Sequence, residues 1–394
     1  MIEFLCWLIV VFFSHNCITK PIQNLRNNKI ITARYNKISD TYEVHMSIGE
    51  PFQRIYFIMS LSQKFSFTNS NLYHKKKSIY YSYHDQQEIK IDNVPFKAEQ
   101  VSDNFEIYKA NFVLENFHFF LLPENFNKKH SYLSFSYKND NYNLNFIYEL
   151  YQNHLIGQRN FAFSKIGPQD MGKLYLGGIP QEEINNKYKV SCNVNEGYSS
   201  WGCNINSILY QNESYPLDDY ASFSVETEDV ISSLNFYKIL QETVFKQYIE
   251  NKQCETLEKA LYYGFNCKCE VAYNFSNITI VLDGIMFELD GNKLFHRLVN
   301  HCEFKIKSYK DSHKDWLIGF SFFNKYVTQF DFDRKMISFY SDYKIPFIEN
   351  NRVLFKSYIY NTLVLLSGIM SAWIIIYCLC NIKRYKVVNI CYKI

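Results

Sequence analysis

Short stretches in which polar and apolar residues alternate fill most of the chain between residues 41 and 340. The segment 41–49 (TYEVHMSIG) has this alternation, and the segment RIYFIM that begins at Arg54 repeats it. Successive side chains of a strand point to opposite faces of its sheet, so a period of two predicts half-buried β-strands. Helical spacing of apolar residues occurs over 146–156 and 236–249. We therefore predict an all-β fold with a few short helices.

The length of the chain, 394 residues, exceeds what one hydrophobic core usually organises. We expect two β lobes of roughly 150 residues each, the N-terminal lobe over 41–187 and the C-terminal lobe over 188–345. Turns are predicted at Gly177–Pro180 in the first lobe and at Asp283–Gly284 in the second.

Two apolar segments lie outside these lobes. Phe4–Phe13 (FLCWLIVVFF) has the length of a signal-peptide core and is too short to span a bilayer, which predicts a signal peptide over 1–19. Tyr358–Cys380 contains no charged residue and is long enough for a transmembrane helix, the alternative being a buried core helix. Basic residues follow it, at Lys383, Arg384 and Lys386, so we predict a cytosolic tail over 381–394. The expected arrangement is a single-pass type I protein of the secretory pathway or cell surface.

The cysteines agree with an oxidising compartment. Six of the 11 cysteines lie in the expected ectodomain, an even number that indicates disulfides and allows fifteen connectivities. These six are Cys192, Cys203, Cys254, Cys267, Cys269 and Cys302. Cys267 and Cys269 are close enough to form half of a metal site, but no second close pair is present in the ectodomain, so disulfides are the preferred interpretation. Asn-x-Ser/Thr sequons at Asn212, Asn274 and Asn277 are glycosylation candidates.

Several classes of function lack a signal. The formal charge of +3 and the absence of a basic stretch interleaved with aromatics argue against nucleic-acid binding. The ten histidines show no H-x-x-x-H or H-E-x-x-H spacing, so no metal site is predicted, and no cofactor motif is present.

The segment from Trp316 to Tyr340 reads WLIGFSFFNKYVTQFDFDRKMISFY and is similar to the closing hairpin of pepsin-like aspartic peptidases. The resemblance extends over roughly residues 41 to 340 and implies a bilobal double β-barrel. It also implies a disulfide between Cys269 and Cys302. Further segments resemble the family in the expected order: Ile48–Gln53, Ser131–Ser136, Phe146–Ile156, Gly172–Ile179, Trp201–Ile208 and Ile278–Leu289.

The family's reaction needs one aspartate from each lobe, and the two carboxylates share a proton. Counting from IGEPFQ without a gap places the first aspartate position at Ser60, followed by Leu61 and Ser62. The segment ASFSVETEDV places the second at Ser224, followed by Val225 and Glu226. A serine hydroxyl is not a base near neutral pH, so the resemblance implies the fold of a peptidase without its catalytic pair. We interpret the two hydroxyls as groups that satisfy buried hydrogen bonds where the carboxylates would lie.

The hairpin that covers the cleft in this family is expected over Ile79–Ile91. Tyr83 is the candidate for the family's cleft tyrosine, with Tyr81 nearly as good a match, and Asp85 lies beside it. Phe320 replaces the Asp or Asn of the last hairpin. The carboxylates considered as substitutes are Asp85, Glu226, Glu228 and Asp229. A carboxylate displaced by two residues along a strand lies about 6–7 Å away, so we expect the paired geometry to be lost.

Three hypotheses follow. The first is a membrane-anchored, catalytically inactive, monomeric homologue whose interlobe cleft binds a peptide or protein partner through main-chain hydrogen bonds. The second is an active aspartic endopeptidase with a divergent active site, although no Asp-[Ser/Thr]-Gly triplet occurs in the chain. The third is a surface adhesin or scaffold whose outer faces alone are functional.

Overall fold

The computed structural model describes residues 29–36, 41–91, 94–107, 112–124, 126, 130–137, 144–166, 171–195, 197–198, 200–211, 213–227, 230–310, 315–319 and 322–347. The predicted signal peptide, transmembrane segment and tail lie outside these residues, as do Asn212, Glu228, Asp229 and Phe320. Within the described residues, no helix has both the length and the apolar character needed to cross a membrane.

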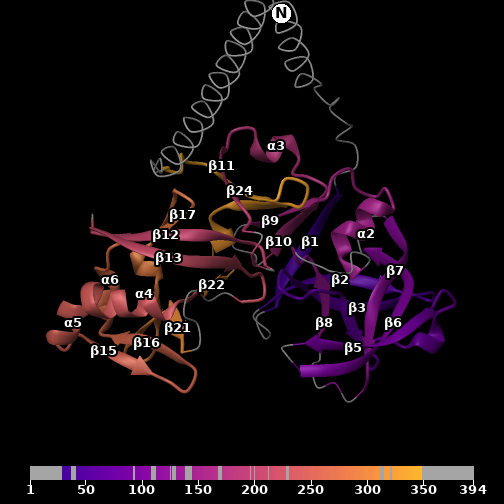
Figure 1. Ribbon diagram of the computed structural model, residues 1–394, viewed down its shortest axis with the longest axis horizontal. Helices are drawn as coiled ribbons and strands as arrows, with labels where there is room; N and C mark the ends of the chain where they lie inside the picture. Colours follow the sequence, from indigo (N-terminus) through magenta and orange to yellow (C-terminus); the bar gives the residue numbers. More distant parts are fainter. Residues whose placement is uncertain are drawn as a thin grey trace, which may run out of the picture. The chain divides into compact units, whose positions relative to one another are not determined.

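The described strands form two sheets, one of 13 strands and one of 11. The first ten strands all belong to the 13-stranded sheet (Figure 1). They are β1 (Lys29–Asn36), β2 (Thr41–Ile48), β3 (Gln53–Ser60), β4 (Phe67–Asn69), β5 (Ser82–Ile91), β6 (Val94–Ile107), β7 (Phe112–Leu122), β8 (Ser131–Ser134), β9 (Asn160–Ile166) and β10 (Met171–Leu176).

The second sheet contains the strands that follow Trp201, up to the closing hairpin. They are β12 (Gly202–Tyr210), β13 (Glu213–Phe223), β14 (Val230–Ser232), β15 (Cys254–Glu258), β16 (Tyr262–Cys267), β17 (Ile278–Leu282), β18 (Ile285–Leu289), β19 (Phe295–Arg297), β20 (Cys302–Phe304), β21 (Lys307–Tyr309) and β22 (Asp315–Ile318).

Three more strands belong to the first sheet, one before and two after the strands of the second sheet, and they tie the two halves of the chain together. They are β11 (Tyr188–Asn193), β23 (Val327–Asp331) and β24 (Met336–Ser341), which continue the sheet in the order β11–β24–β23–β9. In Figure 1, β11 and β24 lie next to each other in the part of the sheet that contains β9, although the chain between β11 and β24 builds the whole second sheet. The predicted division at residue 188 coincides with the start of β11, but the closing hairpin lies in the sheet of the first lobe. The lobe boundaries themselves stay a prediction.

The helices are short. They are α2 (Phe146–Gln152), α3 (Gln181–Ile184), α4 (Leu234–Ile239), α5 (Lys246–Glu250) and α6 (Cys269–Tyr273), with the π-helical turn η5 (Leu240–Val244) and the 3₁₀ turns η2 (Lys75–Lys77), η6 (Gly291–Lys293) and η7 (Phe322–Asn324). The predicted helix over 146–156 is confirmed and ends earlier, at Gln152. Asn145 caps it, because its side chain accepts the free N–H groups of the first turn. The predicted helix over 236–249 is broken into α4, η5 and α5.

Both predicted turns are present. Gly177 and Gly178 have φ of 78° and 137°, and Asp283 and Gly284 have φ of 47° and 86°. Two consecutive residues with positive φ match the right-handed twist of a two-residue hairpin, which explains why Asp-Gly joins β17 to β18.

Trp201 holds the two sheets together at the beginning of β12. Its side chain is completely buried and its indole Nε1 donates a hydrogen bond of 2.7 Å to the carbonyl of Phe135 in the first lobe. The indole also packs edge-on against Phe330 in β23, with 5.2 Å between ring centroids. The junction therefore combines apolar burial with a satisfied polar group.

The six predicted disulfide cysteines form three bonds: Cys192–Cys203, Cys254–Cys267 and Cys269–Cys302. The pairing implied by the resemblance, Cys269–Cys302, is confirmed. Cys254–Cys267 closes the β15–β16 hairpin, whose strands pair these two residues directly.

Candidate functional site

The first predicted aspartate position lies at the C-terminal end of β3. This strand pairs in parallel with β8, which places Ser60 opposite Ser134. Ser60 is completely buried, and its Oγ accepts the backbone N–H groups of Ser62 at 3.2 Å and Gln63 at 2.8 Å. The hydroxyl thus satisfies the amide groups of the turn, in agreement with our interpretation of this residue.

The second position has the same local construction. β13 pairs in parallel with β22, and the N–H of Ser224, the residue after β13, donates to the carbonyl of Ile318 at 2.9 Å. Ser224 is buried, and its Oγ accepts the N–H of Glu226 at 3.0 Å. Each turn therefore follows a strand that is held by a parallel neighbour from its own lobe, and each turn is closed by its serine.

Glu226 joins the two turns. Its carboxylate oxygen Oε1 accepts hydrogen bonds from the hydroxyls of Ser60 at 2.5 Å and Ser62 at 2.8 Å, both from the other lobe. Charge-assisted O–H···O⁻ bonds typically have lengths of about 2.5–2.7 Å, so the contact with Ser60 is a strong one. One carboxylate and two hydroxyls thus occupy the place where the family's pair of carboxylates is expected.

The position of Glu226 corrects our expectation that the carboxylates near the two predicted aspartate positions lie too far away to contact them. That expectation assumed a continuing strand, with about 6–7 Å for two residues. Residues 225 and 226 instead lie in a bend, and the long glutamate side chain reaches across the lobe boundary. Glu228 and Asp229 lie outside the described residues, and Asp85 lies in β5.

The expected covering hairpin is formed by β5 and β6, but its turn lies at 92–93, outside the described residues. Tyr83 and Asp85 lie near the beginning of β5, at the open end of the hairpin, opposite Val101 and Gln100 in β6. The turn of this hairpin follows Ile91, so residues 83–85 lie away from it, and the match of Tyr83 and Asp85 to the family's cleft residues stays a prediction. Tyr83 is 54% exposed.

Two tyrosines near this hairpin have strong carboxylate partners that the sequence did not reveal. The hydroxyl of Tyr73 donates a short hydrogen bond to the buried carboxylate of Asp103. The hydroxyl of Tyr81 donates to Glu99 at 3.2 Å, and burial, with the nearby carboxylate of Glu99, raises the pKa of Tyr81 to about 12. Tyr81 therefore has a structural role in anchoring the hairpin.

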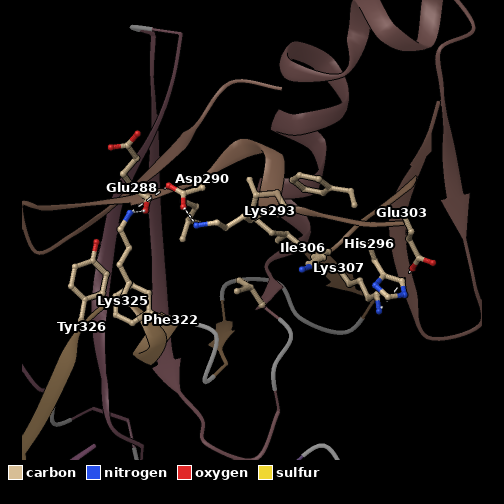
Figure 2. A pocket seen from close by; sticks show the side chains of 15 residues that line it. Glu288, Asp290, Lys293, His296, Glu303, Ile306, Lys307, Phe322, Lys325 and Tyr326 are labelled. Carbon is tan, nitrogen blue, oxygen red and sulfur yellow. Dashed lines mark hydrogen bonds and ion pairs between the residues drawn. The ribbon is translucent and has the colours of Figure 1, made fainter. Parts of the chain in front are cut away.

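A second feature is a cavity of about 790 Å³ in the C-terminal lobe. None of the residues that line it belongs to the Ser60–Glu226 centre. Its charged residues gather at two ends (Figure 2). At one end Asp290 pairs with Lys293 at 2.6 Å and with Lys325 at 3.6 Å, and these partners, Lys293 first, lower the pKa of Asp290. The apolar residues that line the cavity are Val230, Leu289, Leu294, Phe304, Ile306 and Phe322.

Only one group of three metal-type ligands occurs in the described part of the chain: Cys192, Cys203 and Asp283. The two sulfur atoms are bonded to each other in a disulfide, so neither is available as a thiolate ligand. Burial raises the pKa of Asp283, which accepts a hydrogen bond from the side chain of Asn204 at 3.3 Å. We assign this group a structural role.

The sequons have different environments. The side-chain amide of Asn277 donates to Glu288 and accepts the N–H of Gly291 at 2.9 Å. Asn274 ends α6, and its exposed amide donates to the carbonyl of Glu270 at 3.1 Å. Glycosylation of either residue stays a prediction.

Comparison with known proteins identifies the same fold that the resemblance implied. A family model described as eukaryotic aspartyl protease matches residues 130–341. The solved aspartic proteinase of Irpex lacteus superposes with a TM-score of 0.62 at 11% sequence identity, covering 80% of this chain and 97% of that protein. No curated protein matches the sequence. The three disulfides of such a domain indicate a secretory or extracellular location.

Proposed function

Since this chain belongs to the eukaryotic aspartyl protease family, we propose that it is a pepsin-like protein that has lost the peptidase reaction. The observation that supports this proposal is the composition of its centre. The two positions that the resemblance assigns to aspartate carry the buried serines Ser60 and Ser224, and Glu226 is hydrogen-bonded to Ser60. The proposed protein keeps the bilobal scaffold and uses it for binding.

The chemistry supports this proposal. In the paired mechanism one carboxylate takes a proton from water while the other donates one to the scissile carbonyl. Here Oε1 of Glu226 already accepts hydrogen bonds from two serine hydroxyls, and Ser60 is inaccessible to solvent. Both positions that the resemblance assigns to aspartate carry serine, whose hydroxyl is not a base near neutral pH. General acid–base catalysis contributes about 10²–10⁴-fold to a rate. Without a second carboxylic acid to protonate the scissile carbonyl, this contribution is lost.

The Ser60–Glu226 contact also supports a role for the region between the lobes other than cleavage. It crosses the lobe boundary where an extended substrate would have to reach the two turns. A peptide or protein partner would bind by main-chain hydrogen bonds to strand edges. The hydrogen bond between Ser60 and Glu226 would either be kept in the complex or be broken by the partner.

A second candidate, an active endopeptidase with a divergent site, is favoured by one observation. Glu226 brings a carboxylate to the interlobe centre, where a single general base could act on a water molecule.

The third candidate, an adhesin or scaffold, places function on the outer faces. We include in the proposal a type I membrane anchor at Tyr358–Cys380, which the apolar segment and the basic residues after it support. We also propose that the protein is a monomer.

A cleavage assay with a peptide library between pH 3 and pH 7 tests the proposal on the purified full-length chain. We expect no cleavage by the wild type or by Glu226→Gln, with the double variant Ser60→Asp/Ser224→Asp as a comparison. An inactive wild type that binds a transition-state peptide of aspartic peptidases would support a binding cleft. Cleavage that disappears in Glu226→Gln would refute the proposal and establish the second candidate.

A further inference from the structure

Two histidines approach each other on the surface of the β5–β6–β7 sheet region. The ring centroids of His84 in β5 and His118 in β7 are 5.0 Å apart, with 39° between the ring planes. Between them on β6 lies Ser102, a small residue directly opposite His118. The small side chain leaves room for two rings from non-adjacent strands to meet above it.

A β-bulge positions His84. The register of β5 against β6 shifts between Tyr83 and Asp85, so His84 is the extra residue without a partner in β6. Bulges re-aim a side chain and are over-represented beside functional sites. Here the bulge directs the imidazole of His84 to Ser102, with 2.8 Å between Nε2 and Oγ.

Glu149 fixes the orientation of His118. Its carboxylate, on α2, is 5% exposed and its Oε1 accepts from Nδ1 of His118 at 2.9 Å and from the His118 backbone N–H at 3.2 Å. Because an ionised carboxylate only accepts hydrogen bonds, Nδ1 is the donor to Glu149, and a metal ion would be bound through Nε2, the other ring nitrogen. A carboxylate behind a histidine is the usual support for a metal-ligating imidazole.

Each ring therefore retains one nitrogen for an external partner. Nε2 of His118 has no partner among the described residues, and Nδ1 of His84 has none when Nε2–H donates to Ser102. Two imidazoles on one tetrahedral zinc ion, with Zn–N distances of ~2.0–2.1 Å, hold their ring centroids roughly 5 Å apart. The observed separation of 5.0 Å agrees with that arrangement.

We propose that His84 and His118 form a two-histidine site for a divalent transition metal of the zinc and copper class, oriented by Glu149. Imidazole ligands suit zinc, copper and nickel, whereas calcium and magnesium prefer oxygen ligands. The pair is not part of a three-residue ligand group in the described chain, so water or an external ligand completes the coordination. The alternative, a purely structural His118–Glu149 ion pair, requires no contribution from the bulged His84.

Calorimetric titration of the untagged, metal-free full-length chain with Zn²⁺ tests this site. We expect saturable binding with one ion per chain, and at least a ~10-fold loss of affinity for His84→Ala, since one of two ligands is removed. Glu149→Gln should weaken binding about 10–100-fold, as removal of an outer-shell partner typically does. His296→Ala, an exposed strand histidine in the C-terminal lobe, is the matched control and should bind Zn²⁺ as the wild type does.

Co²⁺ gives a second readout, because ligation by imidazole changes its visible absorption spectrum. The change should be present in the wild type and His296→Ala and absent in His84→Ala. His84 is exposed, so its variant should fold even if Glu149→Gln does not. The proposal is overturned if the wild type shows no saturable Zn²⁺ binding, or if His84→Ala binds as tightly as the wild type. Neither result depends on whether the chain cleaves peptides.

Discussion

The contact between Ser60 and Glu226 should contribute measurably to stability, since it joins the lobes through a buried donor and a charged acceptor. Substitution Glu226→Ala leaves the buried hydroxyl of Ser60 without its acceptor. A hydrogen bond to a charged group is worth about 1.5–3 kcal/mol net, and an unsatisfied buried group costs about 1–3 kcal/mol. We therefore expect Glu226→Ala to lower the free energy of unfolding by about 2 kcal/mol.

Single variants of Ser60 mix two effects, because Ser60→Ala also removes the acceptor of the Ser62 and Gln63 amides. A double-mutant cycle with Ser60→Ala and Glu226→Ala isolates the shared term. We expect a coupling energy of about 1.5–2 kcal/mol. Ser62→Ala is the control, since Ser62 is exposed, and its bond to Glu226 should contribute only about 0.5–1 kcal/mol.

The coupling energy is measured by urea unfolding at pH 7, monitored with two probes, tryptophan fluorescence and far-UV circular dichroism. Coincident transitions from the two probes are required before a free energy is assigned to a chain with two lobes. A coupling energy below about 0.5 kcal/mol would refute the reasoning, because independent sites add within that margin. It would mean that Glu226 does not bond to Ser60 in solution.

Three further predictions concern the scaffold. Burial raises the pKa of Asp283 in the folded protein. Its contribution to stability is therefore present below the ordinary Asp pKa of about 3.9 and is lost as pH rises through the higher folded pKa. In thermal unfolding from pH 3 to 7, the wild type should lose stability relative to Asp283→Asn. Replacing both Cys269 and Cys302 by Ala removes a cross-link over 33 residues and should cost about 3.7 kcal/mol by the loop-entropy relation, measured by urea unfolding under oxidising conditions; an unchanged midpoint would contradict it. Trp201→Phe leaves the carbonyl of Phe135 without its donor and should cost about 2–4 kcal/mol, whereas a loss below about 0.5 kcal/mol would show that the indole N–H is unimportant.

Much of the scaffold could be predicted because it depends on local patterns. The alternation in 41–49 predicted β2, and the Asp283–Gly284 signal predicted the β17–β18 turn, since positive φ is required there. Ungapped counting from IGEPFQ assigned Ser60 to the first aspartate position, and in the structure this residue ends β3.

The misjudged features depend on contacts between distant segments. No local pattern indicates that the chain bends at residues 225 and 226, and this bend is what lets Glu226 reach Ser60. The match of Tyr83 and Asp85 to the cleft residues of the family relied on residue types alone and stays a prediction. His84 and His118 lie in different strands, and only the pairing of these strands with β6 brings the two side chains together. Their spacing in the sequence therefore could not predict that they are close.

The return of β23 to the first sheet has a consequence for biosynthesis. β9 ends at Ile166, and its neighbour β23 begins at Val327, so roughly 160 residues must be made before that edge can be paired. At ~5–20 residues per second this takes ~8–30 s. Throughout that interval the nascent first lobe presents an open strand edge, which is a template for pairing with other chains. Ribosome-bound intermediates stalled before Val327 should therefore depend on lumenal chaperones, and those released after Ser341 should not.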